Sequence, residues 1–230
     1  LHVRAKKNSP EELVANIYRS AADLKTREKL GAKPLETWRK AVAKITNKED
    51  FLRVLTDFHR AGIDALFAAG VDQDSKNSAR YMLHLYQSGL GMPDRDYYLL
   101  NTPEQKRVRE AYRGHVEKLY RLFGATPDQA KKNMEAVMRI ETRLAKASMD
   151  KVSVRDPEKT YHKKTIKELE RHTPVLMWKA YLGRAGALRA RDVNLCQPEF
   201  FKEVGKILIE EPLADLKTYL EWHLLNGAAR

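Results

Sequence analysis

The sequence has almost no cysteine and no long apolar run. Cys196 is the single cysteine among 230 residues, so the chain forms no internal disulfide and no zinc knuckle built from paired thiolates. No apolar stretch reaches the roughly 18 residues needed to span a bilayer. A chain of this length buries roughly 70–75% of its unfolded surface and needs no such staple. The first residue is Leu1, so we expect the chain to belong to a longer gene product.

Short motifs that bind metals or phosphates are also missing. None of the seven histidines lies in an H-E-x-x-H motif, and no two are four residues apart, as a helical zinc site requires. The segment 72–83 begins like a calcium loop, but Lys76, Asn77 and Leu83 stand where an oxygen ligand, a glycine and a glutamate belong. Cys196 has no basic motif beside it. We therefore predict no catalytic residue, no metal ligand and no cofactor in this chain.

The net charge of +12 is unevenly distributed. Residues 103–191 carry 22 basic and 11 acidic side chains, whereas residues 192–230 carry 4 and 7. A basic region can bind nucleic acid or an acidic peptide, or can be a solvated helix surface. In residues 103–122 the arginines and lysines lie all around the predicted helix and alternate with glutamates, a pattern typical of internal ion pairs. We therefore expect no nucleic-acid partner.

Helix-start signals recur along most of the chain. Ser9 and Glu12 predict a capping box, and the apolar residues that follow predict a helix up to Gly31. Further starts are predicted at Pro34, Asn47, Thr102, Thr126, Thr165, Pro198 and Pro212. The helices that begin at Thr102 and Thr126 are separated by a very short joint, so we predict a long antiparallel helical hairpin.

The periodicity changes between residues 65 and 87. Ala65–Val71 is a short apolar run, and Arg80–Gln87 alternates tyrosine with leucine, with turn-forming residues between the two. This pattern predicts a β-hairpin, and Asp192–Leu195 is a further candidate strand. The predicted fold class is mainly α: one multi-helix domain over residues 1–230, with the long helical hairpin and one small β-hairpin.

The segment SGLGMPDRDYYL, residues 88–99, follows the predicted hairpin. Its marked residues are Gly89, Gly91, Pro93, Asp94, Arg95, Asp96, Tyr97 and Tyr98. Gly89 and Gly91 permit backbone angles that a side chain forbids, and Pro93 fixes the exit. We expect Arg95 to bind a carboxylate and backbone carbonyls, and at least one tyrosine to anchor the segment in the core. The prediction is a structural corner and not a catalytic loop or a substrate contact.

Five segments in order resemble the neprilysin and endothelin-converting-enzyme family of zinc endopeptidases. They are GVDQDSKNSARYMLHLYQ (70–87), SGLGMPDRDYYL (88–99), RDPEKTY (155–161), NLCQPEFF (194–201) and YLEWHLLN (219–226). The resemblance covers roughly residues 11–226. The single cysteine is more similar to bacterial members than to the disulfide-rich animal ectodomains.

The resemblance implies which half of such an enzyme this chain forms. Family members hold zinc in a thermolysin-like half through H-E-x-x-H and a downstream glutamate, and none of these residues is present here. The chain resembles the other half, a mainly helical cap that faces the catalytic domain across a closed cavity and admits peptides of modest size. The expected partners are that catalytic domain and peptide substrates, with zinc only in the full-length enzyme.

Two alternatives stay open at this point. In the first, the chain is the inactive cap of a zinc metalloendopeptidase. In the second, it is a stand-alone helical module that binds acidic peptide or nucleic acid. For the peptidase we expect a secreted or cell-envelope location, with a cytoplasmic location as the alternative. The gene sequence beyond Arg230 distinguishes the two, because an H-E-x-x-H motif there supports the first and a stop codon supports the second.

Overall fold

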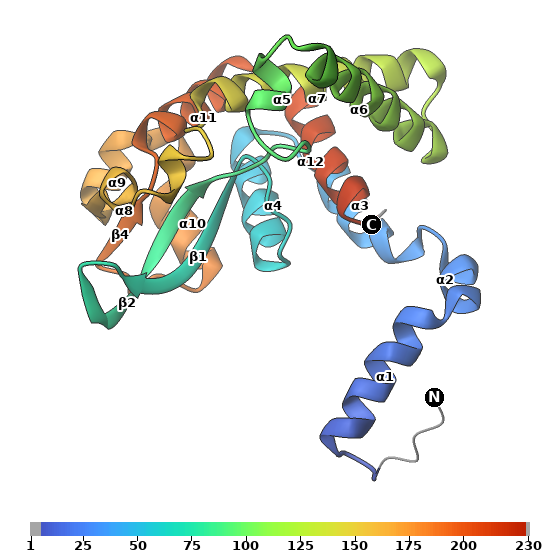
Figure 1. Ribbon diagram of the computed structural model, residues 1–230, viewed down its shortest axis with the longest axis horizontal. Coiled ribbons are helices and arrows are strands. Elements are labelled where there is room, and N and C mark those ends of the chain that lie inside the picture. The colour runs from blue at the N-terminus through green and yellow to red at the C-terminus, as the bar shows by residue number, and fades with distance from the viewer. Residues whose placement is uncertain (1–5, 229–230) are drawn as a thin grey trace. The chain divides into compact units, whose positions relative to one another are not determined.

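The structure is a computed structural model that describes residues 6–228 (Figure 1). It is mainly helical, which confirms the predicted fold class. Its contacts divide the chain into two compact units, Leu1–Lys40 and Ala41–Arg230. Among the described residues, no helix is long and apolar enough to cross a membrane.

The first unit consists of short helices, and none of its described helical residues up to Leu35 is buried. Its elements are α1 (Pro10–Ala22), α2 (Leu24–Leu30), the 3₁₀ helix η1 (Lys33–Leu35) and the start of α3 (Glu36–Ala43). The prediction of one helix up to Gly31 is wrong, because Asp23 interrupts it and caps α2 by accepting a 3.0 Å hydrogen bond from the Thr26 N–H. The repeating apolar side chains of α1 are exposed, for example Ile17 at 69%.

Capping side chains start most of the predicted helices. Asn47 accepts from the Asp50 N–H at 2.8 Å and begins α4, as predicted. Thr165 and Glu168 form a complete capping box. The box predicted at Ser9 is only half formed, because the Glu12 carboxylate accepts from the N–H of Asn8 instead of that of Ser9.

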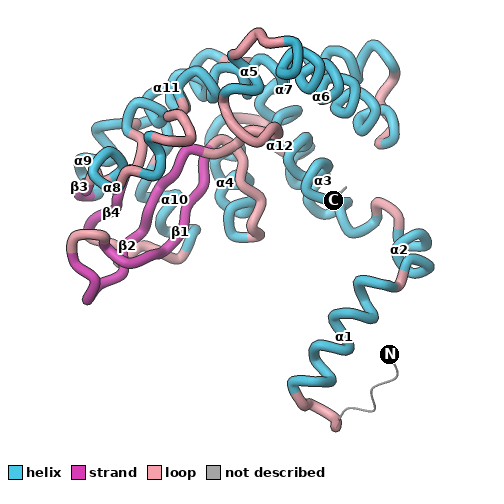
Figure 2. Tube along the Cα trace, in the orientation of Figure 1, coloured by secondary structure: helices cyan, strands magenta, loops and turns pink. Residues whose placement is uncertain are grey.

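The second unit packs helices against a small sheet. Its helices after α3 are α4 (Lys48–Arg60), α5 (Asp96–Leu99), α6 (Pro103–Leu122), α7 (Pro127–Ala147), η2 (Ser153–Arg155), α8 (Pro157–Thr160), α9 (Ile166–His172), η3 (Pro174–Leu176), α10 (Trp178–Ala185), α11 (Pro198–Glu210) and α12 (Leu213–Ala228). Its strands are β1 (Phe67–Asp74), β2 (Asn77–Gln87), β3 (Lys163–Thr165) and β4 (Asp192–Leu195). Within this unit the strands lie together, beside α10 (Figure 2).

The predicted β-hairpin is part of a larger sheet. Strands β1 and β2 pair antiparallel from Phe67 opposite Gln87, which confirms the hairpin, and the sheet order is β1-β2-β4-β3. Strand β4 is the predicted strand at Asp192 and pairs parallel with β2, while β3 was not predicted. The sequence of β3, Lys163-Lys164-Thr165, has no apolar alternation, so only its pairing with β4 makes it a strand.

The helical hairpin of α6 and α7 is confirmed, and two arginines of α7 form ion pairs with the C-terminal part of the chain. Arg143 on α7 binds Glu203, Glu210 and Glu211 of the α11 region at 2.6–3.0 Å. Arg139 binds Glu211 at 3.0 Å and also Asp215. Acidic residues of the C-terminal part therefore neutralise arginines of the basic middle part, which accounts for some of the uneven charge distribution.

An aromatic core lies between the sheet and the helices. Phe67 of β1 packs against Trp178, Tyr181 and Phe201, with ring centroids 5.3–5.7 Å apart. Phe67, Trp178 and Phe201 are fully buried. This core holds α10 and α11 on the sheet and fixes the end of β2, from which the segment 88–99 leaves.

Candidate functional site

Gly89 begins the corner after β2 with a backbone angle that favours glycine. Its φ is +85°, and a Cβ at this position would lie 2.4 Å from the Tyr219 hydroxyl and 2.7 Å from the Leu66 nitrogen. That hydroxyl donates to the Gly89 carbonyl at 2.7 Å and accepts from the Leu66 N–H at 3.0 Å. Both the φ angle and the closeness of α12 therefore require glycine here.

Gly91 is required for a different reason, the close approach of a tyrosine. A Cβ at Gly91 would lie 1.8 Å from the Tyr112 hydroxyl of α6. The Gly91 N–H donates to the Tyr98 hydroxyl oxygen and to Oε1 of Glu141, both at 3.1 Å. The backbone of the corner is thus bound directly to side chains of three helices.

Glu141 of α7 is the centre of this arrangement and has no exposed surface. Its Oε2 accepts from the Tyr98 hydroxyl at 2.8 Å, and the Tyr112 hydroxyl lies 2.9 Å from both oxygens. Trp222 Nε1 donates to the Tyr112 hydroxyl at 3.0 Å. The ring of His223 approaches Oε1 to 4.0 Å. Donors therefore surround a buried carboxylate, as the burial of such a group requires.

Burial is the main influence on the protonation of Glu141. It raises the pKa of this carboxyl to about 7, against the hydrogen bonds from Tyr98 and Tyr112, which lower it. The same burial raises the pKa of both tyrosines far above the usual range. Glu141 was not predicted as a site residue, although it occupies the inner face of its helix between Val137 and Leu144. A carboxylate on an apolar face was the signal that sequence reasoning missed.

Arg95 lies at the other end of the corner. Its Nη1 donates to the carbonyl of Ser148 at 2.6 Å, where α7 ends. Asp94 accepts a 2.8 Å hydrogen bond from the N–H of Asp96, the first residue of α5. A second arginine was not predicted here: Arg109 Nη1 donates to the carbonyl oxygens of residues 97 and 98 at 3.0 and 2.7 Å.

The marked residues differ in exposure. Gly89 and Tyr98 are buried, and Pro93 is exposed. The other five have intermediate exposure: Gly91, Asp94, Arg95, Asp96 and Tyr97. Tyr98, and not Tyr97, enters the Glu141 cluster. Several polar groups of the corner are bound within the fold: the Gly91 N–H and the Tyr98 hydroxyl to Glu141, and the Arg95 guanidinium to the Ser148 carbonyl. That the corner is structural stays a prediction.

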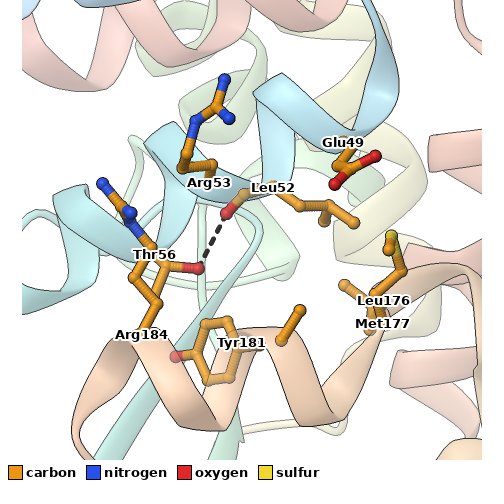
Figure 3. A pocket seen from close by; sticks show the side chains of 9 residues that line it. Glu49, Leu52, Arg53, Thr56, Leu176, Met177, Tyr181 and Arg184 are labelled. Carbon is orange, nitrogen blue, oxygen red and sulfur yellow. Dashed lines mark hydrogen bonds between the residues drawn. The ribbon is translucent and has the colours of Figure 1, made fainter.

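A separate pocket of about 190 Å³ lies between α4 and α10 (Figure 3). Leu52, Leu176 and Tyr181 line it, and the Thr56 hydroxyl at its edge donates to the carbonyl of Leu52 at 2.7 Å. Arg184 at the rim is bound by both oxygens of an aspartate of α4 at 2.6 and 2.7 Å. The pocket is a small apolar recess with a charged rim.

Metal-binding and nucleophilic groups are not gathered in the part of the chain that the structure describes. Among residues 6–228, no three side chains of His, Cys, Asp or Glu are placed to hold a metal ion. Burial raises the pKa of the Cys196 thiol to about 12 and lowers that of His59 to about 4. A thiol with so high a pKa is a poor nucleophile.

Comparison with known proteins gives the family. The model of peptidase family M13, N-terminal part, matches residues 2–230. The chain is 32% identical to endothelin-converting enzyme 1 of Cavia porcellus and 30% identical to that of Homo sapiens, in each case over 95% of the chain. It spans only 30% of the length of these relatives.

Solved structures agree with this result. The zinc metalloprotease Zmp1 of Mycobacterium tuberculosis, solved in complex with an inhibitor, matches 96% of the chain and 34% of its own length, with a TM-score of 0.88 and 25% identity. PepO of Lactobacillus rhamnosis shares the fold, with a TM-score of 0.77 over 98% of the chain, 35% of its own length and 17% identity. The chain therefore belongs to peptidase family M13, the family of neprilysin and endothelin-converting enzyme, and forms its N-terminal region.

Proposed function

We propose that the chain is the cap half of a zinc metalloendopeptidase, which encloses a peptide-binding cavity and limits the size of the substrate. The observation that carries this proposal is the match of the whole chain to the N-terminal third of metalloproteases. The Glu141 cluster supports it, because it makes the corner between sheet and helices rigid without offering chemistry of its own. A rigid wall suits a cavity that selects by size.

Zinc is proposed for the full-length enzyme and not for this chain. The sequence lacks H-E-x-x-H, and the described residues gather no ligand set that fits the ion. A bound zinc ion in such a peptidase activates water and polarises the scissile carbonyl. The residues of this chain take no part in that step, so we propose that their contribution is to position and enclose the peptide.

Metal analysis and a peptidase assay test whether zinc binding and catalysis need the part of the enzyme outside this chain. The isolated chain is expected to bind less than one zinc per molecule after dialysis and to cleave no quenched-fluorescence peptide, whereas the full-length protein does both. One tightly bound zinc per isolated chain, or cleavage that a chelator abolishes, contradicts the proposal. A gene that stops after Arg230 supports the alternative of a stand-alone binding module.

Size selection needs a test on the full-length protein. One cleavable sequence is embedded in unfolded peptides of increasing length, and finally in a loop of a folded protein. The value of kcat/KM is expected to fall steeply once the substrate exceeds the cavity. A value that does not depend on length or folding refutes enclosure while leaving the peptidase assignment intact.

A further inference from the structure

Strand β1 lies at the edge of the sheet and is paired on one side only, with β2 (Figure 2). One hydrogen bond shows which of its backbone groups face outward. The Leu85 carbonyl of β2 accepts from the Cys196 N–H at 3.0 Å, so the backbone groups of Leu85 point towards β4 and away from β1. In an antiparallel pair, two opposite residues either bind each other or both point away. Ala69, which lies opposite Leu85, therefore points its N–H and C=O to the free edge.

The direction repeats at every second residue of β1. Val71 points its N–H and C=O to the free edge as Ala69 does, and neither residue forms a backbone hydrogen bond outside the ladder to any residue that the structure describes. Gln73, the next in this series, donates its N–H to Oδ1 of Asp72 at 2.7 Å, which agrees with this direction and closes the edge there. Val71 is 69% exposed. Ala69 and Val71 therefore each offer a donor and an acceptor to an added strand.

A groove of about 380 Å³ begins at this edge, on one face of the sheet. Val71, Tyr81 and Leu83 line it, and their positions in the ladder place all three side chains on the same face. Towards the base of the hairpin, α10 and α11 cover this face through their contacts with Phe67. Nearer the tip, Val71 and Tyr81 are each 69% exposed. The groove therefore has an apolar floor that the helices of this unit leave uncovered.

The rim of the groove is basic. Arg189 and Arg191, in the loop between α10 and β4, line the groove and are exposed, and neither forms an ion pair with a residue that the structure describes. The third arginine of the lining, Arg80, binds Asp192, which is the acidic residue of the lining. That carboxylate is therefore neutralised within the fold. Two guanidinium groups remain for an acidic ligand.

We propose that the free edge of β1 and this groove bind an extended acidic peptide, which adds a strand to the sheet at residues 69–71. The backbone of the peptide forms hydrogen bonds with Ala69 and Val71, and one of its apolar side chains lies over Val71. An acidic side chain on the same face binds Arg189 and Arg191. The site goes beyond the proposed function, because binding here needs neither zinc nor an enclosed cavity.

A second copy of this chain fits the groove less well than an acidic peptide. Antiparallel pairing of two β1 strands would place the residues with outward backbone groups opposite one another. The added strand would then present Ala69, Val71 and Gln73 to the groove, and none of these is acidic. The two arginines of the rim would gain no partner. Charge complementarity therefore favours a peptide that carries a carboxylate.

Nuclear magnetic resonance on the ¹⁵N-labelled chain tests the proposal, with the peptide acetyl-Thr-Val-Thr-Glu-Thr-Ser-amide as the probe. Its valine and glutamate are two positions apart and so lie on the same face of an extended strand. Shifts are expected at residues 69–73, 81–83 and 187–192, and the amide protons of Ala69 and Val71 should move downfield as they gain acceptors. The same peptide with lysine in place of glutamate should bind at least about tenfold more weakly.

Methylation of the peptide backbone separates strand addition from binding through side chains alone. Every second N–H of an added strand faces β1, and the others face away. One form of the probe is N-methylated at its second and fourth residues, and another at its third and fifth. One of the two should bind at least about tenfold more weakly, and the other should bind within about twofold of the parent peptide.

Variants of the chain assign the contacts. Val71→Pro removes an N–H that takes no part in the ladder with β2, so the variant should fold, and it should raise Kd at least about tenfold. Val71→Ile keeps the N–H and the apolar side chain and should leave Kd nearly unchanged. The double variant Arg189→Gln, Arg191→Gln should also raise Kd at least about tenfold. Its matched control, Arg107→Gln with Arg121→Gln, removes two exposed arginines of α6 and should leave Kd unchanged.

Several outcomes overturn the proposal. If the probe shifts none of these amides, or if the two methylated forms bind alike, no strand is added to β1. If the lysine peptide binds as tightly as the probe, or if the double arginine variant of the rim binds like the wild type, the acidic specificity is wrong. If sedimentation shows a dimer of the chain that Val71→Pro disrupts, the edge binds a second copy and not a peptide.

Discussion

Replacement of Glu141 by glutamine tests whether a buried carboxylate supports the corner. The pKa of this carboxyl is about 7 in the folded chain, and its ordinary value of 4.5 serves as the reference for the unfolded chain. Between these values the unfolded chain releases the proton and the folded chain keeps it. The free energy of unfolding contributed by Glu141 is therefore largest below pH 4.5, falls as the pH rises to 7, and is constant above.

The magnitude follows from the difference between the two pKa values. With one pKa unit equal to about 1.4 kcal/mol, the free energy of unfolding should fall by about 2–3 kcal/mol between pH 5 and pH 8 because of this group alone. Glu141→Gln keeps the size and an acceptor for Tyr98 and Tyr112 but cannot ionise. The stability of the variant should therefore depend less on pH, and the variant should gain on the wild type as the pH rises.

Urea unfolding of both proteins at pH 5, 6, 7 and 8 measures this difference. Tryptophan fluorescence follows the unfolding, and Trp222, which lies beside Tyr112, contributes to it together with Trp38 and Trp178. The difference between the two unfolding free energies should change by about 2–3 kcal/mol across the range. Parallel pH profiles would show that Glu141 titrates alike in both states, and the account of the cluster would then be wrong. A profile that rises with pH would indicate that the hydrogen bonds outweigh burial.

Two further substitutions test the two ends of the corner. In Gly91→Ala the new Cβ would lie 1.8 Å from the Tyr112 hydroxyl and forces it away. We expect the free energy of unfolding, measured in urea, to fall by at least about 2 kcal/mol. In the control Gly114→Ala no atom lies within 4 Å of the new Cβ, so this variant should be as stable as the wild type or slightly more stable. Equal effects of the two substitutions would contradict the close packing at Gly91. Arg95→Ala removes a charged donor from the end of α7 and should cost about 1–3 kcal/mol; a change below about 0.5 kcal/mol would instead favour an arginine held for a ligand.

Local signals were enough to predict most of the helices and the hairpin. Asn47 and Thr165 start helices because their side chains satisfy N–H groups a few residues away, and such contacts can be read from spacing alone. The interruption at Asp23 was missed because an aspartate within a helical pattern fits the pattern and also caps a new helix. Strand β3 was missed because its pairing, and not its own residues, defines it.

The candidate site was predictable only in part. Glycine, proline and tyrosine in residues 89–98 indicated a corner, because each limits or permits particular backbone angles nearby. The partner of that corner was not readable, since Glu141 is 50 residues from Gly91 along the chain. Nothing in the local sequence shows which buried group will meet a free N–H group. Arg109 was missed for the same reason. Its side chain donates to backbone carbonyls of the corner, a contact that was expected of Arg95.

The contacts of Gly89 and Gly91 also set an order of assembly. The corner is bound by Glu141 and by Tyr219, which lies 130 residues after Gly89. During synthesis these partners leave the ribosome long after the hairpin, and strand β2 also waits for β4 to complete the sheet. Contacts between residues so distant in sequence form slowly and expose apolar surface meanwhile. The β-hairpin and the loop after it therefore need α12 to complete their contacts. A chain truncated before α12 should not complete the fold of this unit.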